Sequence, residues 1–183
     1  SGKLYRYVAF RIIKDNKKKL DKKYLKKITK NITFKKLQNN KMMYADHVTS
    51  YSSAIAKIKL IRKLLYKFQK KFSKNKKFII EGRDIASKIL PKADLKLFFK
   101  CSPGEKAKRR LREYNKGKRK ITLKEVKKSL KKRDYSDKNR KESPLLFVKG
   151  AVLVDTTNLT IKQMEAKLKK LVQEAIQKKY GNL

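Results

Sequence analysis

The chain has 183 residues, with 55 Lys or Arg against 15 Asp or Glu, a formal net charge of +40, and 39% hydrophobic residues along its length. This composition predicts a folded domain with a cationic surface and excludes a disordered basic tail, which would lack the apolar residues. One cysteine and one histidine exclude a disulfide framework, a cysteine-based zinc site and His-rich metal chemistry, and no apolar run or signal peptide directs the chain to a membrane, so we expect a cytoplasmic protein.

The first part of the chain is predicted to be mostly helical. Apolar residues spaced for one helical face predict three helices, over 4–13, 18–30 and 48–73. Between the second and third helices, brief alternation predicts a pair of short strands over 31–37 and 41–45, with a turn at Asn39-Asn40.

The remainder of the chain is predicted to alternate buried strands with helices. Three short apolar runs are typical of buried parallel strands, and they lie at 78–80, 95–99 and 151–154. Each later helix starts with a capping signal: Ser102 with Pro103 and Glu105, Thr122 with Glu125, and Thr160 with Gln163. Gly181 is positioned to end the last helix. The pattern predicts an α/β fold with a parallel sheet.

Glu81-Gly82-Arg83-Asp84 directly follows the first of these strands, where ligands bind in open parallel sheets. Its glycine permits close backbone approach, while arginine and aspartate offer a phosphate donor and a carboxylate acceptor. A turn with a surface ion pair is the competing interpretation. Ser1-Gly2-Lys3-Leu4 is not a Walker A loop, because no upstream glycine precedes it and leucine follows the lysine.

The basic residues are 45 Lys and only 10 Arg. Lysine scattered over every segment favours a compositional bias over specific nucleic-acid binding, and it makes the few arginines informative, because specific phosphate recognition favours Arg. Half of them lie in two clusters, at Arg109, Arg110 and Arg112 and at Arg133 and Arg140. Asp137, spaced for the same helical face as Arg133 and Arg140, leaves a surface salt-bridge ladder as the alternative.

Four segments, in order and in register, resemble the motifs of bacterial cytidylate kinases. Ser1-Gly2-Lys3-Leu4-Tyr5-Arg6 is similar to their SGxxYR segment, and Glu81–Asp84 to their GRD segment. Arg133–Arg140 with the following Ser143-Pro144-Leu145 resembles their RDxxDxxR lid, and Val154-Asp155-Thr156-Thr157 their DT/ST segment. The resemblance covers residues 1 to about 178. It implies a P-loop nucleoside monophosphate kinase-like fold, with a parallel sheet flanked by helices, that phosphorylates CMP or dCMP with Mg²⁺ and ATP.

The resemblance also implies roles for individual residues. Arg6 and Arg83 would hold the acceptor phosphate, and Ser53, Arg62 and Asp84 would read the cytosine edge. Ser1 matches a further CMP contact, Asp137 would accept from a ribose hydroxyl, and Arg109 and Arg112 would face ATP. Arg83, Arg133 and Arg140 are the candidate catalytic arginines, with Arg133 reaching the phosphates when a lid closes. Tyr5 and Leu4 are interpreted as packing residues.

We expect a single, monomeric domain over 1–183, with an acceptor-nucleotide insertion at 17–52 and a lid at 109–145, and no specific nucleic-acid partner. The family's first strand, phosphate loop, first helix and second strand have no counterpart here, so we expect these residues to be an unstable fragment without turnover. The family hairpin is also hard to recognise in 31–47, which leaves pyrimidine selectivity open. Two alternatives are a basic RNA- or DNA-binding domain without catalysis and a relative that prefers UMP.

Overall fold

The computed structural model describes residues 1–38, 41–73, 78–117 and 120–181. These residues form two compact units. Unit 1 comprises Ser1–Ile89 and Arg140–Pro144, and unit 2 comprises Leu90–Asn139 and Leu145–Leu183. The predicted lid at 109–145 crosses this division. The boundaries of the lid and of the insertion stay predictions, and each unit is described here by itself.

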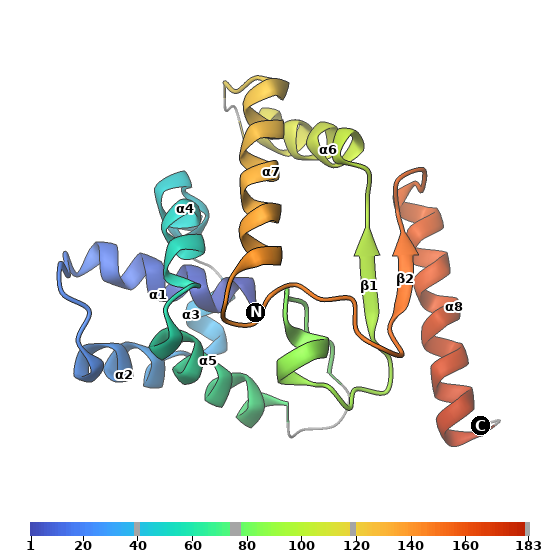
Figure 1. Cartoon of the computed structure of the whole chain (residues 1–183), viewed down its shortest axis with the longest axis horizontal. Helices are drawn as coiled ribbons and strands as arrows, with labels where there is room; N and C mark the ends of the chain where they lie inside the picture. Colours follow the sequence, from blue (N-terminus) through green and yellow to red (C-terminus); the bar gives the residue numbers. More distant parts are fainter. Residues whose placement is uncertain (39–40, 74–77, 118–119, 182–183) are drawn as a thin grey trace. The chain divides into compact units, whose positions relative to one another are not determined.

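Unit 1 is helical throughout its regular structure (Figure 1). Its elements are α1 (Gly2–Lys14), α2 (Lys22–Lys30), α3 (Phe34–Gln38), the 3₁₀ turn η1 (Lys41–Tyr44), α4 (Asp46–Ile55), α5 (Lys59–Phe72) and the π-helical turn η2 (Ile85–Ile89). The predictions for α1 and α2 are confirmed. Asp21 begins α2, where its carboxylate accepts from the Tyr24 backbone N–H at 2.7 Å.

The core of unit 1 lies between α1, α2, α4 and α5. Each helix contributes apolar residues spaced by three or four, and fully buried examples are Val8, Leu25, Ile55, Ile61 and Leu65. Burial of such side chains contributes roughly 1.5–3 kcal/mol each. Ile13, near the end of α1, is 39% exposed.

Four predicted elements of unit 1 are wrong, and three of them lie between residues 31 and 73. The strands over 31–37 and 41–45 are replaced by α3 and η1, and Thr33 Oγ1 accepts from the Lys36 backbone N–H near the start of α3. The predicted turn at Asn39-Asn40 lies outside the described residues. The helix over 48–73 is divided into α4 and α5 at 56–58, where Ile58 takes an extended conformation.

The predicted strand at 78–80 is also absent. Residues 78–81 have no strand partner within the described ranges, and Ile79 is 97% exposed. An isolated extended segment cannot satisfy its backbone groups through a ladder, so its apolar composition alone does not make it a strand.

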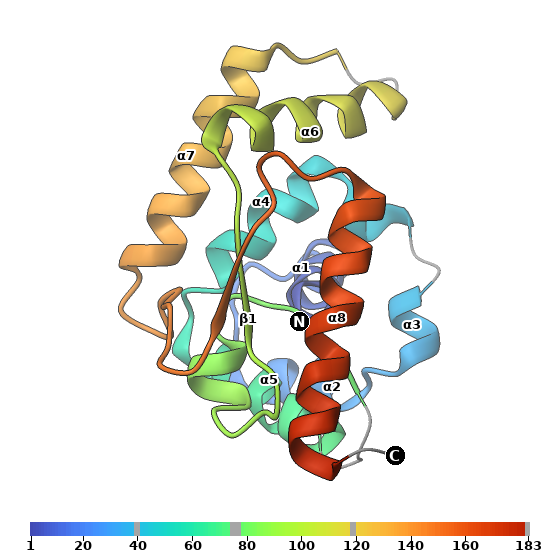
Figure 2. The same ribbon diagram turned by 90° about the vertical axis from the view of Figure 1, so that its right-hand side faces the viewer.

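Unit 2 confirms the α/β class in a reduced form. Its strands β1 (Leu97–Lys100) and β2 (Val152–Asp155) pair in parallel, with Leu97 opposite Val152 and Lys100 opposite Asp155. Helices α6 (Pro103–Lys116) and α7 (Leu123–Asn139) pack against each other. After β2, helix α8 (Ile161–Tyr180) runs back in the opposite direction to the strand (Figures 1 and 2).

The three predicted caps of unit 2 are confirmed. Ser102 Oγ accepts from the Glu105 backbone N–H at 3.3 Å, with Pro103 in the first turn. Thr122 with Glu125 and Thr160 with Gln163 form reciprocal capping hydrogen bonds. Gly181 ends α8 at a φ of 75°, which a residue with a side chain rarely adopts.

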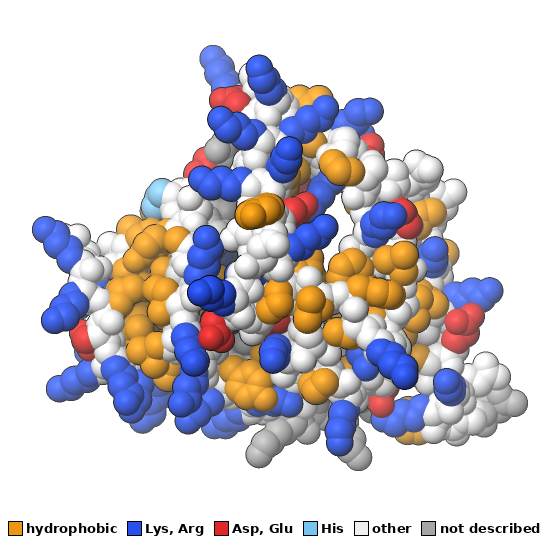
Figure 3. Space-filling model, in the orientation of Figure 1, with side chains coloured by type: hydrophobic (Ala, Val, Ile, Leu, Met, Phe, Trp, Pro, Cys, Tyr) orange, Lys and Arg blue, Asp and Glu red, His pale blue; other side chains and the backbone are white. Residues whose placement is uncertain are grey.

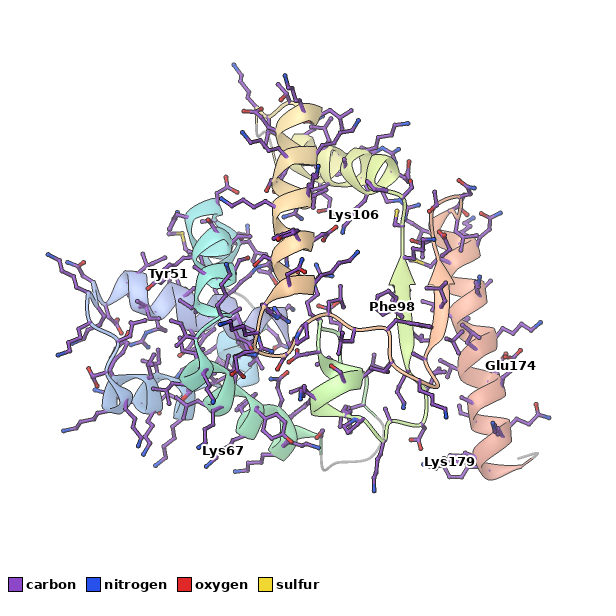
Figure 4. All side chains as sticks on the ribbon, in the orientation of Figure 1. Tyr51, Lys67, Phe98, Lys106, Glu174 and Lys179 are labelled. Atoms are coloured by element: carbon purple, nitrogen blue, oxygen red, sulfur yellow. The ribbon has the colours of Figure 1, made fainter. Side chains whose placement is uncertain are left out.

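The core of unit 2 is small. Ala107, Val126 and Val154 are buried, and the rings of Phe98 and Phe147 meet edge to face at 5.3 Å (Figure 4 labels Phe98). On the face drawn in Figure 3, hydrophobic side chains show over the strands, and Lys and Arg are scattered over all elements and form no single strip. Among the described helices, none combines the length and apolar character that crossing a membrane requires.

Candidate functional site

A buried ion pair between Arg62 and Asp84 forms the centre of the candidate site in unit 1. Arg62 Nη2 donates to Asp84 Oδ2, and both side chains are only 8% exposed. The break between α4 and α5 supports the pair, because it leaves the Ala56 carbonyl free to accept from Arg62 Nη1 at 2.9 Å. Asp84 in turn precedes η2, whose Lys88 and Ile89 backbone N–H groups donate to the Asp84 carbonyl. Two of the three residues that the resemblance assigns to the cytosine edge are therefore in direct contact.

Tyr5 closes one side of this ion pair. The Arg62 guanidinium lies 5.6 Å from the centre of the Tyr5 ring, within the range of a cation–π contact. Burial raises the pKa of the Tyr5 phenol, and the Asp84 carboxylate adds to the rise, whereas the Arg62 and Arg140 guanidinium groups oppose it. Tyr5 and Arg140 therefore share the electrostatic environment of the ion pair, although α1 and the segment after α7 are far apart in the sequence.

The glycine of the Glu81–Asp84 segment allows a close approach to the start of α1. A Cβ atom on Gly82 would stand 2.3 Å from Ser1 Oγ and 2.9 Å from Ile85 Cγ1, closer than real Cβ contacts. The Ser1 nitrogen donates to the Glu81 carbonyl at 2.5 Å. Two of the segments that carried the resemblance are thus in direct contact, and a side chain at position 82 would displace those of Ser1 and Ile85.

Three further predicted residues of unit 1 are placed less centrally. The Arg6 guanidinium lies over the Tyr44 ring at 4.8 Å, which fixes its direction. Ser53 is exposed, and its hydroxyl donates to the Thr49 carbonyl of its own helix at 3.4 Å. Arg83 is half-buried beside the ion pair in sequence. The described contacts do not join Ser53 to Arg62 or Asp84.

Arg109 of unit 2 is held by the turn between β2 and α8. Its Nη2 donates to the carbonyl oxygens of Thr156 at 2.7 Å, Thr157 at 3.2 Å and Leu159 at 3.3 Å. Its Nε donates to Glu105 Oε1 at 3.0 Å. These hydrogen bonds of the Arg109 guanidinium therefore hold the turn in place. Its predicted contact with ATP stays a prediction.

The turn itself is a network around the Asp155-Thr156-Thr157 segment. Asp155 Oδ1 accepts from the Thr157 backbone N–H at 2.9 Å and from its hydroxyl at 2.6 Å, which lowers the pKa of Asp155. Thr157 Oγ1 accepts from the Ser102 backbone N–H at 2.9 Å, linking the ends of β1 and β2. The residue types of this motif thus have a local structural explanation.

The remaining predicted residues lie on or next to α6 and α7. Arg112 is 68% exposed, with a guanidinium nitrogen 3.9 Å from Glu105. Arg133 and Asp137 approach to 3.9 Å on α7 as their spacing predicts. Arg140 departs from the prediction of a shared helical face, because α7 ends at Asn139 and Arg140 Nε donates to the Ser143 carbonyl at 2.7 Å.

The interpretation of Tyr5 as a packing residue is confirmed, because it packs against the core of unit 1. Sequence reasoning did not indicate that the same ring also contacts the guanidinium of the central pair. Its position in the SGxxYR segment, one residue before Arg6, was the available signal.

Comparison with known proteins supports the family resemblance that the four segments indicated. A family model described as cytidylate kinase matches residues 1–174. The chain belongs to the cytidylate kinase family. Curated cytidylate kinases of Fusobacterium nucleatum and Clostridium botulinum are 37% and 33% identical, over 90% and 95% of this chain and 79% and 84% of their own lengths. The cytidylate kinase of Caldicellulosiruptor bescii is 29% identical over 96% of the chain.

Family membership identifies the chain as a nucleoside monophosphate kinase, a phosphotransferase, and favours neither alternative raised from the sequence. Neither a non-catalytic nucleic-acid-binding domain nor a UMP-preferring kinase is among the names of these relatives. The scatter of Lys and Arg side chains on the face drawn in Figure 3 agrees with that outcome.

Proposed function

We propose that this chain accepts CMP or dCMP in unit 1 and transfers the γ-phosphoryl group of ATP to it, giving the diphosphate and ADP. The observation that carries the proposal is the buried Arg62–Asp84 pair. An ion pair removed from water gains little stability over an apolar pair of equal volume, so its presence in the helical core favours a binding role.

The chemistry of the pair suits the edge of cytosine. The cytosine amine is a donor that carboxylates accept from, and its ring nitrogen and carbonyl are acceptors. Arg62 engages Asp84 through Oδ2, which leaves Oδ1 to accept from the amine while the guanidinium donates to the ring. Uracil places a carbonyl where cytosine has the amine, so the same carboxylate would repel it. The exposed Ser53 is proposed as a further donor to this edge.

The acceptor phosphate is proposed to bind Arg6 and Arg83. Arg6 is held in one direction by the Tyr44 ring, and a fixed guanidinium loses little freedom when it grips phosphate oxygens. Ser1 and Arg140 belong to the same unit and supply a hydroxyl and a third guanidinium. Since phosphoryl transfer depends mainly on positioning and on stabilising charge, these groups fulfil the main requirements on the acceptor side.

In unit 2 we propose that Asp137 accepts from a ribose hydroxyl and that Arg133 neutralises charge on the transferring group. Arg112, which is exposed, is proposed to contact ATP directly. Arg109 is proposed to act toward ATP by shaping the turn after β2. In kinases Mg²⁺ is held largely by substrate phosphates and water, so we treat it as part of the ATP substrate.

The finer fold assignment is also a proposal: a nucleoside monophosphate kinase sheet completed by a phosphate loop. No G-x-x-x-x-G-K-[ST] sequence occurs in the 183 residues, and backbone N–H groups of such a loop cradle the β- and γ-phosphates in this class of enzyme. We propose that these 183 residues bind CMP and need such a loop for turnover. The monomeric state is likewise proposed.

The test is an assay of CDP formation from ATP and CMP. The 183-residue chain is compared with the same chain joined at Ser1 to a strand, phosphate loop, helix and second strand from a cytidylate kinase. We expect CDP only from the joined protein. Equal turnover by both proteins would contradict the role given to the loop, and no turnover by a folded joined protein would contradict the proposed function.

A further inference from the structure

A cavity of about 330 Å³ lies between α1 and α2 of unit 1, and none of its lining residues has a role in the proposed reaction. We call it the α1–α2 pocket; its polar lining is Arg11, Asp15, Lys17, Tyr24, Lys27 and Asn31. The two helices are joined by the segment at 15–21 (Figure 1). The volume of the α1–α2 pocket is at the lower end of the range for small-molecule sites.

The charges of the pocket leave an excess of positive charge. Three cationic side chains face one carboxylate, and that carboxylate is already engaged. Asp15 Oδ2 accepts from Arg11 Nη2 at 3.0 Å and from the Tyr24 hydroxyl at 2.9 Å. Burial would raise the pKa of Asp15, but these two donors outweigh it and lower the pKa. The carboxylate is therefore ionised and satisfied internally, and it does not neutralise the two lysines.

The two lysines of the pocket form no ion pairs with the described residues, so their charges can attract a bound anion. In the part of the chain that the structure describes, neither Lys17 nor Lys27 comes within 4 Å of a carboxylate. Lys17 instead lies over the Tyr24 ring, with its Nζ 5.5 Å from the ring centre, and this contact directs it toward the pocket wall.

The pocket lining holds one buried donor, Arg11 Nε, without a regular hydrogen-bond partner among the described residues. The pKa of Arg11 is raised by its hydrogen bond to Asp15 and, to a smaller extent, by the neighbouring Tyr7 hydroxyl, which does not line the pocket. Buried polar groups nearly always have partners, so each exception calls for an explanation. An anion with several oxygen atoms, entering a pocket with excess positive charge, would supply acceptors for the Lys17 and Lys27 ammonium groups.

We propose that the α1–α2 pocket binds a small multivalent phosphate: inorganic pyrophosphate or the phosphate tail of a nucleotide. An arginine with two flexible lysines is a typical phosphate-binding set. A second phosphate group adds contacts that a monovalent anion cannot make. This inference does not depend on the proposed function, because its test measures binding and not turnover.

The experiment follows the backbone amide resonances of residues 24–31 by NMR while the 183-residue chain is titrated with pyrophosphate at constant ionic strength. We expect saturable shifts at these amides. In the double variant K17A/K27A the affinity should fall about five- to tenfold. The matched control is K19A/K26A, which removes two exposed lysines from the same segment and helix, and it should change the affinity less than about twofold.

A parallel titration with ATP identifies the source of the phosphate. Tighter binding of ATP than of pyrophosphate at the same amides assigns the pocket to a nucleotide tail, and equal or weaker binding assigns it to the free anion. Shifts that fail to saturate, or an equal loss of affinity in K17A/K27A and K19A/K26A, would overturn the proposal, because they would reflect the net charge of the chain alone. Both pairs of lysines are at the surface, so we expect both double variants to be folded to the same extent as the parent chain, which their amide spectra will show.

Discussion

Replacing Asp84 by alanine leaves the Arg62 guanidinium buried without its carboxylate. Both side chains are 8% exposed, and among the described residues the other acceptor of Arg62 is the Ala56 carbonyl at 2.9 Å. Removing one partner of a buried pair costs about 3–5 kcal/mol. Because domains are stable by only about 5–15 kcal/mol, we expect Asp84→Ala to lose a large share of the free energy of unfolding.

The assay is equilibrium unfolding in urea. With an m-value of about 2 kcal/mol/M, the expected loss moves the midpoint down by about 2 M. Asp84→Asn keeps the volume and one acceptor, so it should lose less. The double variant R62M/D84L removes both charges, and we expect it to recover to within about 2 kcal/mol of the parent.

Binding separates the functional role from the structural one. R62M/D84L should fold and yet lose the preference for CMP over UMP. A loss below about 1 kcal/mol in Asp84→Ala at unchanged m-value would refute the claim that this pair is desolvated. Full CMP preference in R62M/D84L would refute its role in reading the base.

The other predictions concern Gly82, the turn after β2 and the Asp15 network. Gly82→Ala should reduce the free energy of unfolding, measured in urea, by about 1–3 kcal/mol through its clash with Ser1 and Ile85. Gly104→Ala, whose Cβ meets nothing within 4 Å, should leave this free energy unchanged or raise it. Equal losses in the two variants would contradict the contact of Gly82 with Ser1 and Ile85. Arg109→Lys should reduce the free energy of unfolding by about 2 kcal/mol and speed hydrogen exchange in the turn between β2 and α8, whereas Arg112→Lys should not. Unchanged exchange in Arg109→Lys would show that the hydrogen bonds of Arg109 to this turn are not formed in solution. The pKa of Asp15 is below its usual value in the folded state, so its contribution to stability is present above about pH 4 and disappears as the pH falls through the lowered pKa. Asp15→Asn should flatten that part of the acid unfolding profile, and an unchanged profile would argue against the network.

Local signals predicted the helices and their ends well. Ser102, Thr122 and Thr160 all form the hydrogen bonds that their sequence context indicates, because a cap is decided by residues three positions apart. The apolar spacing of α1 and α2 worked for the same reason. These features require no knowledge of the rest of the chain.

The failures all depend on distant partners or weak local preference. The break between α4 and α5 falls in Ala56-Lys57-Ile58, which contains no helix-breaking residue, and the Ala56 carbonyl is bound by Arg62. The segment at 78–80 is apolar enough for a strand but has no neighbour to pair with among the described residues. Short apolar runs are ambiguous for this reason.

The candidate site was predicted as a set of residues and not as a geometry. Arg62 and Asp84 are 22 positions apart, and neither charge spacing nor periodicity indicates that they meet. The resemblance to the family supplied both residues as site candidates, since the motifs of a family reflect contacts in the fold that no local pattern contains. Tyr5 packs against the core as interpreted, but its contact with Arg62 could not be predicted, because that contact depends on the folded unit.

Equilibrium binding of CMP, UMP and AMP to the 183-residue chain, measured side by side, tests the central claim most directly. If Asp84 accepts from the cytosine amine, CMP should bind at least about tenfold more tightly than UMP, the range expected for one well-placed base contact. Equal affinities for CMP and UMP in a folded chain would contradict the assignment of the Arg62–Asp84 pair to cytosine.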